Sequence, residues 1–184
     1  MKNAIIFHGT DDNPDRYWYR WLASQLEKAG YEVKVPHNPT INHEPINSFL
    51  PKAMKGLSFD DETVLIGHSA GGPLILSILE QLNAPIAQAI LVAGYSEHPD
   101  DQMEDPVLQE EYNWIKIKKN VKDIIFINST NDPWSCDDEQ GRIMFDQLGG
   151  TQIIRTDGHF GSIPKNQDYD TFPLLKALIL GQES

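Results

Sequence analysis

Short apolar runs alternate with amphipathic segments along most of this chain. Six runs are rich in Ile, Val, Leu or Phe and end at glycine, proline or polar residues, as buried strands do. They lie at residues 4–7, 31–35, 63–67, 87–94, 123–128 and 151–156. Runs that stay apolar on both faces of a strand are typical of parallel sheets covered by helices.

Between these runs, apolar residues recur three and four positions apart, which predicts helices with one buried face. The predicted helices run from Trp18 to a stop at Gly30 and over residues 45–55, 70–82, about 137–147 and about 171–180. Strands and helices that alternate in this way predict an α/β fold. We expect a three-layer sandwich, in which a parallel sheet of about six strands has helices on both faces.

One connection is much longer than the others. Residues 95–122 separate two predicted strands, whereas such connections usually have two to six residues. The segment begins with the acidic stretch EHPDDQMEDP and continues with LQEEYNWIKIKKN, which predicts a helix. It is either a lid or an ordinary crossover helix with a long lead. Because no linker or repeat interrupts the pattern, residues 1–184 are predicted to form a single domain.

Charge and composition narrow the classes of partner. The chain has 15 Lys and Arg against 27 Asp and Glu, a net charge of −12, which disfavours nucleic acid and anionic membranes. The start, MKNAIIFHGT, lacks the apolar core of a signal peptide, and no stretch is apolar enough to span a bilayer. Cys136 is the only cysteine, so neither an intramolecular disulfide nor a cysteine-based metal site is expected. We expect a cytoplasmic protein that acts on small molecules.

Residues 65–79, LIGHSAGGPLILSIL, contain a serine between two glycines in the spacing G-x-S-x-G. A nucleophilic serine of this kind stands on a strained turn between a buried strand and a helix, and the run 63–67 and the helix 70–82 supply that context. Side chains at Gly67 or Gly71 would press on the backbone as the chain reverses. The alternative is a turn that needs glycine only for packing. Neither G-x-G-x-x-G nor a P-loop occurs.

A serine hydroxyl needs a base, and the base needs a carboxylate to orient it. Asp132 follows the run 123–128 in NSTNDPW, and His159 follows the run 151–156 in DGHFG. Both lie at the carboxyl edge of the predicted sheet, in the chain order Ser, acid, His. We therefore predict that Ser69, Asp132 and His159 form a catalytic triad.

Other titratable residues fit these roles less well. Asp123 opens its strand at the wrong edge, Asp137 and Asp138 are predicted to begin a helix, and Asp157 is close to His159 in sequence. Three other histidines lie in proline-rich or acidic loops and are expected to be solvated: His37, His43 and His98. His68 is expected to pack beside the site. A metal site built on His37 and His43 has no recognised spacing, so no metal is expected.

The negative charge that develops on the attacked carbonyl oxygen needs backbone donors. One predicted donor is the N–H of Ala70, directly after the nucleophile at the start of a helix. The other is the N–H of Thr10, because Gly9 in HGTDDNP allows close approach of the backbone. The alternative is that His8 and Gly9 form only a strand-ending turn.

The segments FHGT, GHSAG, NSTNDPW and DGHFG, in this order and spacing, resemble the α/β-hydrolase superfamily. The short length and the stretch WIKIKKNVKDIIFINSTNDPW look like the small serine hydrolases related to retinoblastoma-binding protein 9. The likeness extends from Ile5 to about Leu180. It implies a compact sheet without the superfamily's usual first two strands, the same triad, no cofactor, and hydrolysis of esters or amides.

The substrate pocket is the least determined feature. Trp114, Trp134 and Phe160 lie near the expected edge of the site and either form an apolar acyl pocket or pack in the core or the lid. The leading hypothesis is a serine hydrolase that cleaves small carboxylic esters through an acyl-enzyme. The alternatives are an amidase or aminopeptidase-like enzyme, a thioesterase, and a non-catalytic interaction module on the same fold.

Overall fold

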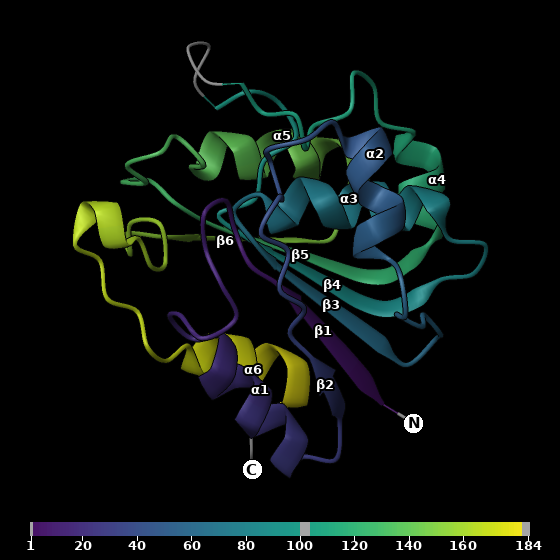
Figure 1. Ribbon diagram of the computed structural model, residues 1–184, viewed down its shortest axis with the longest axis horizontal. Helices are drawn as coiled ribbons and strands as arrows, with labels where there is room; N and C mark the ends of the chain where they lie inside the picture. Colours follow the sequence, from purple (N-terminus) through teal and green to yellow (C-terminus); the bar gives the residue numbers. More distant parts are fainter. Residues whose placement is uncertain (1, 100–103, 182–184) are drawn as a thin grey trace.

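The protein is described by a computed structural model, which covers residues 2–99 and 104–181. Six strands form one sheet in the order β2-β1-β3-β4-β5-β6, and all neighbouring pairs are parallel (Figure 1). The strands are β1 (Asn3–Phe7), β2 (Glu32–Lys34), β3 (Thr63–His68), β4 (Ile86–Val92), β5 (Val121–Ser129) and β6 (Thr151–Arg155). The predicted parallel sheet is confirmed.

Helices cover both faces of the sheet and complete three layers. One face carries α1 (Tyr19–Lys28) and α6 (Pro173–Leu180); the other carries α2 (Ile46–Ala53), α3 (Gly71–Gln81), α4 (Trp114–Lys119) and α5 (Asp138–Leu148) (Figure 1). A short 3₁₀ helix, Ile163–Lys165, was not expected from the sequence. Within the described ranges, no helix is long and apolar enough to cross a membrane.

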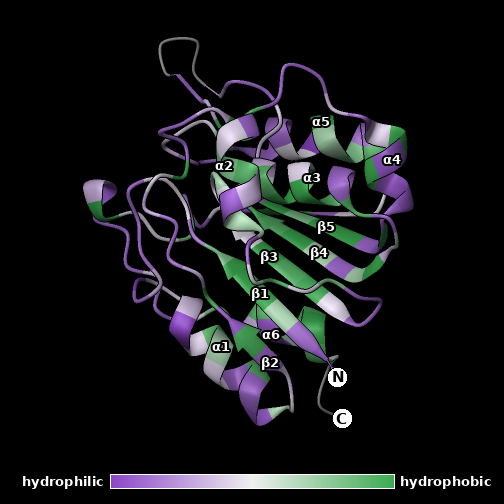
Figure 2. Cartoon of the chain, turned by 45° about the vertical axis from the view of Figure 1, so that its right-hand side comes forward, coloured by the Kyte–Doolittle hydropathy of each residue, from purple (hydrophilic) through white to green (hydrophobic). Residues whose placement is uncertain are grey.

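The core lies between the central strands and the helices above and below them. Every residue of β3 is buried, and Figure 2 shows the hydrophobic colouring concentrated on the sheet. The edge strands are more exposed than the central ones, because each pairs with only one neighbouring strand. Ile154 of the edge strand β6, for example, is 52% exposed. The edge position of β2 also explains its length of three residues, since it pairs only with β1.

The register of the sheet brings the carboxyl ends of the inner strands together. Phe7 of β1 lies opposite Gly67 of β3, while His68 lies opposite Val92 of β4. Val92 in turn lies opposite Ile127 of β5. The loops after these strands therefore leave the sheet at one edge, which is where open parallel sheets place their ligand sites.

The long connection contains less helix than its sequence pattern indicated. Among residues 95–99 and 104–122, only Trp114–Lys119 is helical, and the side chain of Asn113 caps its first turn by accepting a hydrogen bond from Lys116 N at 3.0 Å. The predicted lid, residues 95–122, includes residues 100–103, which lie outside the described part of the chain. Its role as a lid stays a prediction.

Candidate active site

Ser69 stands on a strained turn between β3 and α3. Its φ of +52° is rare for a residue with a side chain, and its amide donates to Val92 O at 2.9 Å. The two neighbouring glycines make the turn sterically feasible. A Cβ on Gly71 would lie 2.6 Å from Phe7 O, and one on Gly67 would collide with the backbone of Gly71. The turn therefore stores strain at a half-buried serine.

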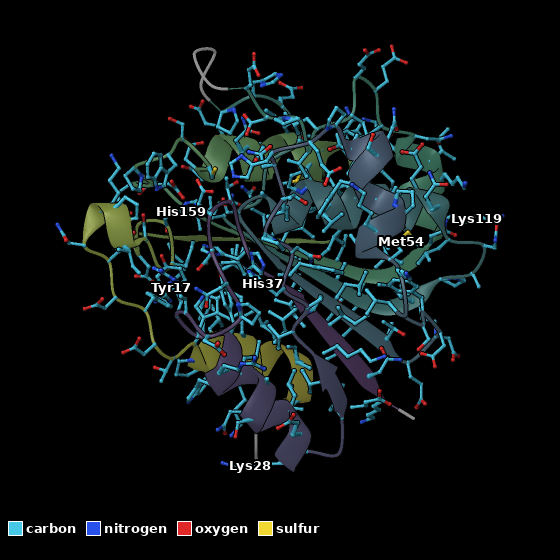
Figure 3. The ribbon with its side chains drawn as sticks, viewed as in Figure 1. Tyr17, Lys28, His37, Met54, Lys119 and His159 are labelled. Atoms are coloured by element: carbon cyan, nitrogen blue, oxygen red, sulfur yellow. The ribbon has the colours of Figure 1, made fainter. Side chains whose placement is uncertain are left out.

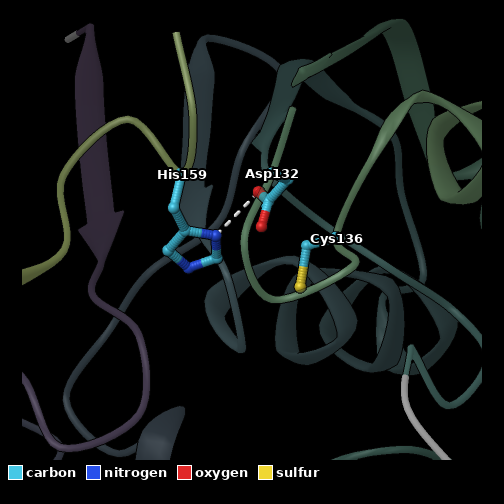
Figure 4. Close-up of side chains that lie close together, drawn as sticks. All are labelled: Asp132, Cys136 and His159. Atoms are coloured by element: carbon cyan, nitrogen blue, oxygen red, sulfur yellow. Dashed lines mark hydrogen bonds and ion pairs between the residues drawn. The ribbon is translucent and has the colours of Figure 1, made fainter. Parts of the chain in front are cut away.

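Asp132 and His159 form a buried acid–base pair. His159 Nδ1 lies 2.8 Å from Asp132 Oδ2, and the side chains are 8% and 0% exposed, respectively (Figure 4). The second carboxylate oxygen, Oδ1, accepts a hydrogen bond from Trp134 N at 2.8 Å. A carboxylate only accepts, so Nδ1 carries the proton and Nε2 is left as the basic nitrogen.

One cavity of about 300 Å³ brings the predicted groups together. Its lining includes Ser69, His159 and Thr10, which come from the loops after β3, β6 and β1. Among the residues that the structure describes, no hydrogen bond joins the Ser69 hydroxyl to His159, whereas the His159–Asp132 bond is formed. Catalytic hydrogen bonds are often loose in unliganded enzymes and tighten when substrate binds.

His8 fixes the orientation of the loop after β1. Its Nε2 accepts a hydrogen bond from Asn38 N at 2.9 Å, so Nδ1 carries the proton and donates to Gly9 O at 2.8 Å. Burial lowers the pKa of His8, which favours this neutral form. The N–H of a trans peptide points away from its carbonyl, so the Thr10 N–H faces away from His8. Ala70 is the N-cap residue of α3, where amides have no partner within the helix.

Gly9 lies against the serine itself. A Cβ on Gly9 would stand 2.9 Å from Ser69 Cβ and 3.5 Å from Ser69 Oγ. We expect Gly9→Ala to displace the serine or the loop and to lower kcat for a short-chain ester about 100-fold, the usual effect of losing one such donor. Gly56→Ala is the control for kcat, because a Cβ there meets nothing within 4 Å and its φ of +74° places the strain of the added side chain away from the cavity lining. A Gly9→Ala enzyme with wild-type kcat would show that the loop does not need this close approach.

The predicted pocket aromatics occupy three different environments. Trp134 lines the cavity, and its ring lies under the Lys165 ammonium at 4.6 Å. Phe160 is fully buried and stacks on Phe172, with the ring centroids 5.4 Å apart. Trp114 is in α4 and packs against Tyr112, on the side of the molecule away from the cavity lining. Of the three, only Trp134 is placed to contact a substrate.

Polar groups that sequence reasoning missed also line the cavity. They include Asp12, Tyr17, Asn42 and Asp105. The buried Asp105 carboxylate accepts from Asn42 Nδ2 at 2.9 Å and from the Tyr95 hydroxyl at 3.0 Å, which ties the segment after β4 to the loop before α2. Figure 3 shows Tyr17 and His159 on the same side of the molecule. Asn42 and Asp105 meet although they are 63 positions apart along the chain, and no local pattern in the sequence marks such a pair.

The remaining acids and histidines have other partners. Asp137 caps α5, Asp157 accepts from Arg155 and Tyr169, and Asp123 lies within β5. His43 contacts Asp11 at 2.6 Å in an exposed pair, and His98 lies 3.4 Å from Asp105. The side chains of these two histidines are 48% and 55% exposed, respectively, and both lie outside the acid–base pair.

Cys136 completes a compact group with the acid–base pair. Its Sγ, the Asp132 carboxylate and the His159 ring nitrogen lie within 4.8 Å of one another (Figure 4). Burial raises the pKa of the Cys136 thiol, which therefore stays protonated. A thiol must lose its proton to bind a metal, and burial keeps the Cys136 thiol protonated, so we assign no metal to this group.

A parallel sheet with this strand order and a serine turn after its third strand defines an α/β-hydrolase. The chain belongs to the serine hydrolase family, whose family model, described as "Serine hydrolase", matches residues 4–179. It is an enzyme of that class.

Curated proteins and solved structures agree with this family. The chain is 30% identical over 161 residues to the serine hydrolase RBBP9 of Rattus norvegicus, with 83% of each chain covered. It is 28% identical over 135 residues to the hydrolase YdeN of Bacillus subtilis, with 71% of each covered. The crystal structure of the B. subtilis ydeN gene product superimposes with a TM-score of 0.86 at 24% identity, covering 98% of this chain and 97% of that one.

Proposed function

We propose that this serine hydrolase cleaves small carboxylic esters through an acyl-enzyme intermediate, with Ser69 as nucleophile, His159 as general base and acid, and Asp132 as its orienting carboxylate. The observation that carries the proposal is the buried 2.8 Å contact between His159 Nδ1 and Asp132, on the cavity that Ser69 lines. That contact leaves Nε2 of His159 as the nitrogen able to take a proton.

The reaction runs in two halves. His159 Nε2 takes the Ser69 proton as Oγ bonds to the ester carbonyl carbon, and the carbonyl oxygen becomes an oxyanion. The backbone amides of Thr10 and Ala70 are the proposed donors to that oxygen. Collapse of this intermediate breaks the bond to the alcohol, which leaves with the proton from His159. Water then attacks the acyl carbon as His159 Nε2 takes its proton. The bond from that carbon to Ser69 Oγ breaks, Oγ receives the proton from His159, and the acid is released.

The cavity supports a small acyl group. Its volume of about 300 Å³ is at the lower end for ligand pockets. Asp105 and Tyr95, which are joined by a hydrogen bond, line it together with the apolar ring of Trp134. Amidase, aminopeptidase-like and thioesterase activities use the same groups and remain alternative reactions of this site. The expected cytoplasmic location likewise stays a prediction.

A panel of matched acyl compounds tests the substrate class. We expect nitrophenyl acetate and butyrate to be hydrolysed with a kcat/KM at least about tenfold above that of the octanoate, because the longer chain exceeds the pocket. The butyryl anilide and butyryl thioester should be slower than the butyryl ester. A preference for the anilide would establish the amidase alternative, and a preference for the thioester would establish the thioesterase alternative.

A further inference from the structure

A chain of buried polar groups leads from the loop after β1 to the loop that carries His159. The Tyr19 hydroxyl oxygen lies 2.7 Å from Asp12 Oδ2 and 2.6 Å from His68 Nδ1. His68 Nε2 lies 2.7 Å from the backbone oxygen of His159. Tyr19 is 0% exposed and His68 is 2% exposed. The Asp12 side chain, at 7%, is almost as deeply buried.

The protons in this chain can be counted from its acceptors. The carbonyl oxygen of His159 only accepts, so His68 Nε2 must carry a proton. A neutral His68 then offers Nδ1 as an acceptor, and that nitrogen needs the Tyr19 proton. An ionised Asp12 also only accepts, and it needs the same proton. One hydroxyl cannot donate to both, so ionised Asp12 with neutral His68 leaves one of the three contacts without a hydrogen.

One additional proton satisfies all three contacts. If it sits on Asp12, the acid donates to the Tyr19 oxygen, Tyr19 donates to His68 Nδ1, and His68 donates to His159. If it sits on His68 instead, two opposite charges must be buried. Desolvation disfavours that second arrangement.

We propose that Asp12, protonated at neutral pH, heads a hydrogen-bonded chain through Tyr19 and His68 that positions the His159 loop and couples it to the loop carrying Gly9 and Thr10. The three are positioning residues, since they act on the reaction through His159. This inference rests on the proposed function only for its kinetic consequence. The proton itself is a property of the folded protein.

The surroundings of Asp12 agree with a bound proton. Burial raises the pKa of Asp12 despite its contacts with the Tyr19 hydroxyl and the Asn13 amide, and burial followed by repulsion from His159 lowers the pKa of His68 to about 3. Four charged or titratable groups face the hydrogen-bonded chain formed by Asp12, Tyr19 and His68. They are His8, Arg16, Tyr17 and His159. Arg16 favours the ionised acid, but its Nε is 3.6 Å from Asp12 Oδ1 and its side chain is 38% exposed.

The other hydrogen bonds of the His159 loop show which part of its backbone depends on the hydrogen-bonded chain. Gln167 Oε1 accepts from His159 N at 2.8 Å, and Trp18 Nε1 donates to Phe160 O at 3.0 Å. These two partners hold the backbone N–H of His159 and the carbonyl of Phe160. The carbonyl of His159 itself is held by His68.

The direct test is the titration of the Asp12 carboxyl carbon by NMR of the full chain, with the resonance assigned from its loss in Asp12→Asn. We expect Asp12 to keep the chemical shift of a protonated acid at pH 7. Titration together with the ordinary carboxyls, near pH 4, would overturn the proposal. This measurement requires neither a substrate nor catalysis.

Stability supplies a second readout with a definite sign. A raised pKa means that the native state holds a proton that the unfolded state has lost, so Asp12 lowers stability as pH rises above about 4. Asp12→Asn supplies a permanent donor to Tyr19 and an acceptor for Asn13, so we expect it to be more stable than the wild type at pH 7 by thermal unfolding. A less stable Asp12→Asn variant would show that the wild-type carboxyl is ionised.

Kinetics test the positioning role. In the wild type we expect kcat to decline at alkaline pH as Asp12 loses its proton, and Asp12→Asn should lack this decline because its amide does not titrate. Tyr19→Phe should lower kcat about tenfold with KM nearly unchanged, because it removes the hydroxyl that contacts Asp12, His68 and the backbone of Gly9. Tyr112→Phe is the matched control, since it also removes a buried tyrosine hydroxyl, but Tyr112 packs on Trp114 at the start of α4.

The outcomes separate the two proposals. A protonated Asp12 with unchanged kcat in Tyr19→Phe would confirm the proton and overturn the positioning role. A fluorophosphonate probe that fails to label the wild-type serine would overturn the proposed catalytic roles and leave the NMR result standing.

Discussion

Ser69→Ala should eliminate hydrolysis of short-chain nitrophenyl esters, with kcat falling on the order of 10⁶-fold, as for a serine that acts with its base as one unit. The physical reason is that Ser69 supplies the only hydroxyl on the strained turn at the cavity. Alanine keeps the Cβ and the backbone strain, so thermal stability should stay close to that of the wild type. Initial rates and thermal unfolding of the same sample measure both quantities.

Ser69→Gly is the companion variant. It should be equally inactive, yet more stable than Ser69→Ala by about 1 kcal/mol, because glycine adopts the φ of +52° without a Cβ clash. Ester hydrolysis that survives in both variants at more than about one per cent of the wild-type kcat would exclude Ser69 as the nucleophile.

Asp132→Asn should lower kcat about 10⁴-fold at neutral pH, with little change in KM. In the wild type, His159 Nδ1 lies 2.8 Å from Asp132 Oδ2. The asparagine amide would present either a donor or a weaker acceptor to that nitrogen. The ring then favours the tautomer with the proton on Nε2, which cannot accept the serine proton. Steady-state kinetics on a short-chain ester measure the loss.

Asp137→Asn is the matched control for this substitution. Asp137 caps α5 by accepting from Glu139 N at 3.1 Å, and asparagine caps helices about as well. Its kcat should equal that of the wild type. If Asp132→Asn retained a kcat within about tenfold of the wild type, another acid would have to orient the base.

Much of this architecture follows from periodicity in the sequence. The apolar runs before Ser69 and Asp132 are buried strands, so parallel topology alone places the residues after them at one edge of the sheet. His159 follows the partly exposed strand β6, yet the same argument holds because register depends on pairing rather than burial. These residues were therefore predictable as neighbours, although their catalytic roles stay predictions.

Contacts made across long stretches of chain were not predictable. Tyr19 meets His68 49 positions away, and His68 meets His159 after a further 91. No local pattern encodes such pairs. The pocket aromatics show the same limit, because a sequence gives no direction to a side chain in a loop. Phe160 turns into the core beside Phe172, although it follows His159 directly.

The central claim is that Ser69 is an activated nucleophile, and covalent labelling of the native enzyme tests it most directly. Wild-type protein is treated with a fluorophosphonate probe, digested, and mapped by mass spectrometry, with heat-denatured protein and Ser69→Ala treated in parallel. We expect one adduct, on Ser69, that is absent from both controls. An adduct on a different residue, or a folded wild-type enzyme that does not react, would contradict the claim.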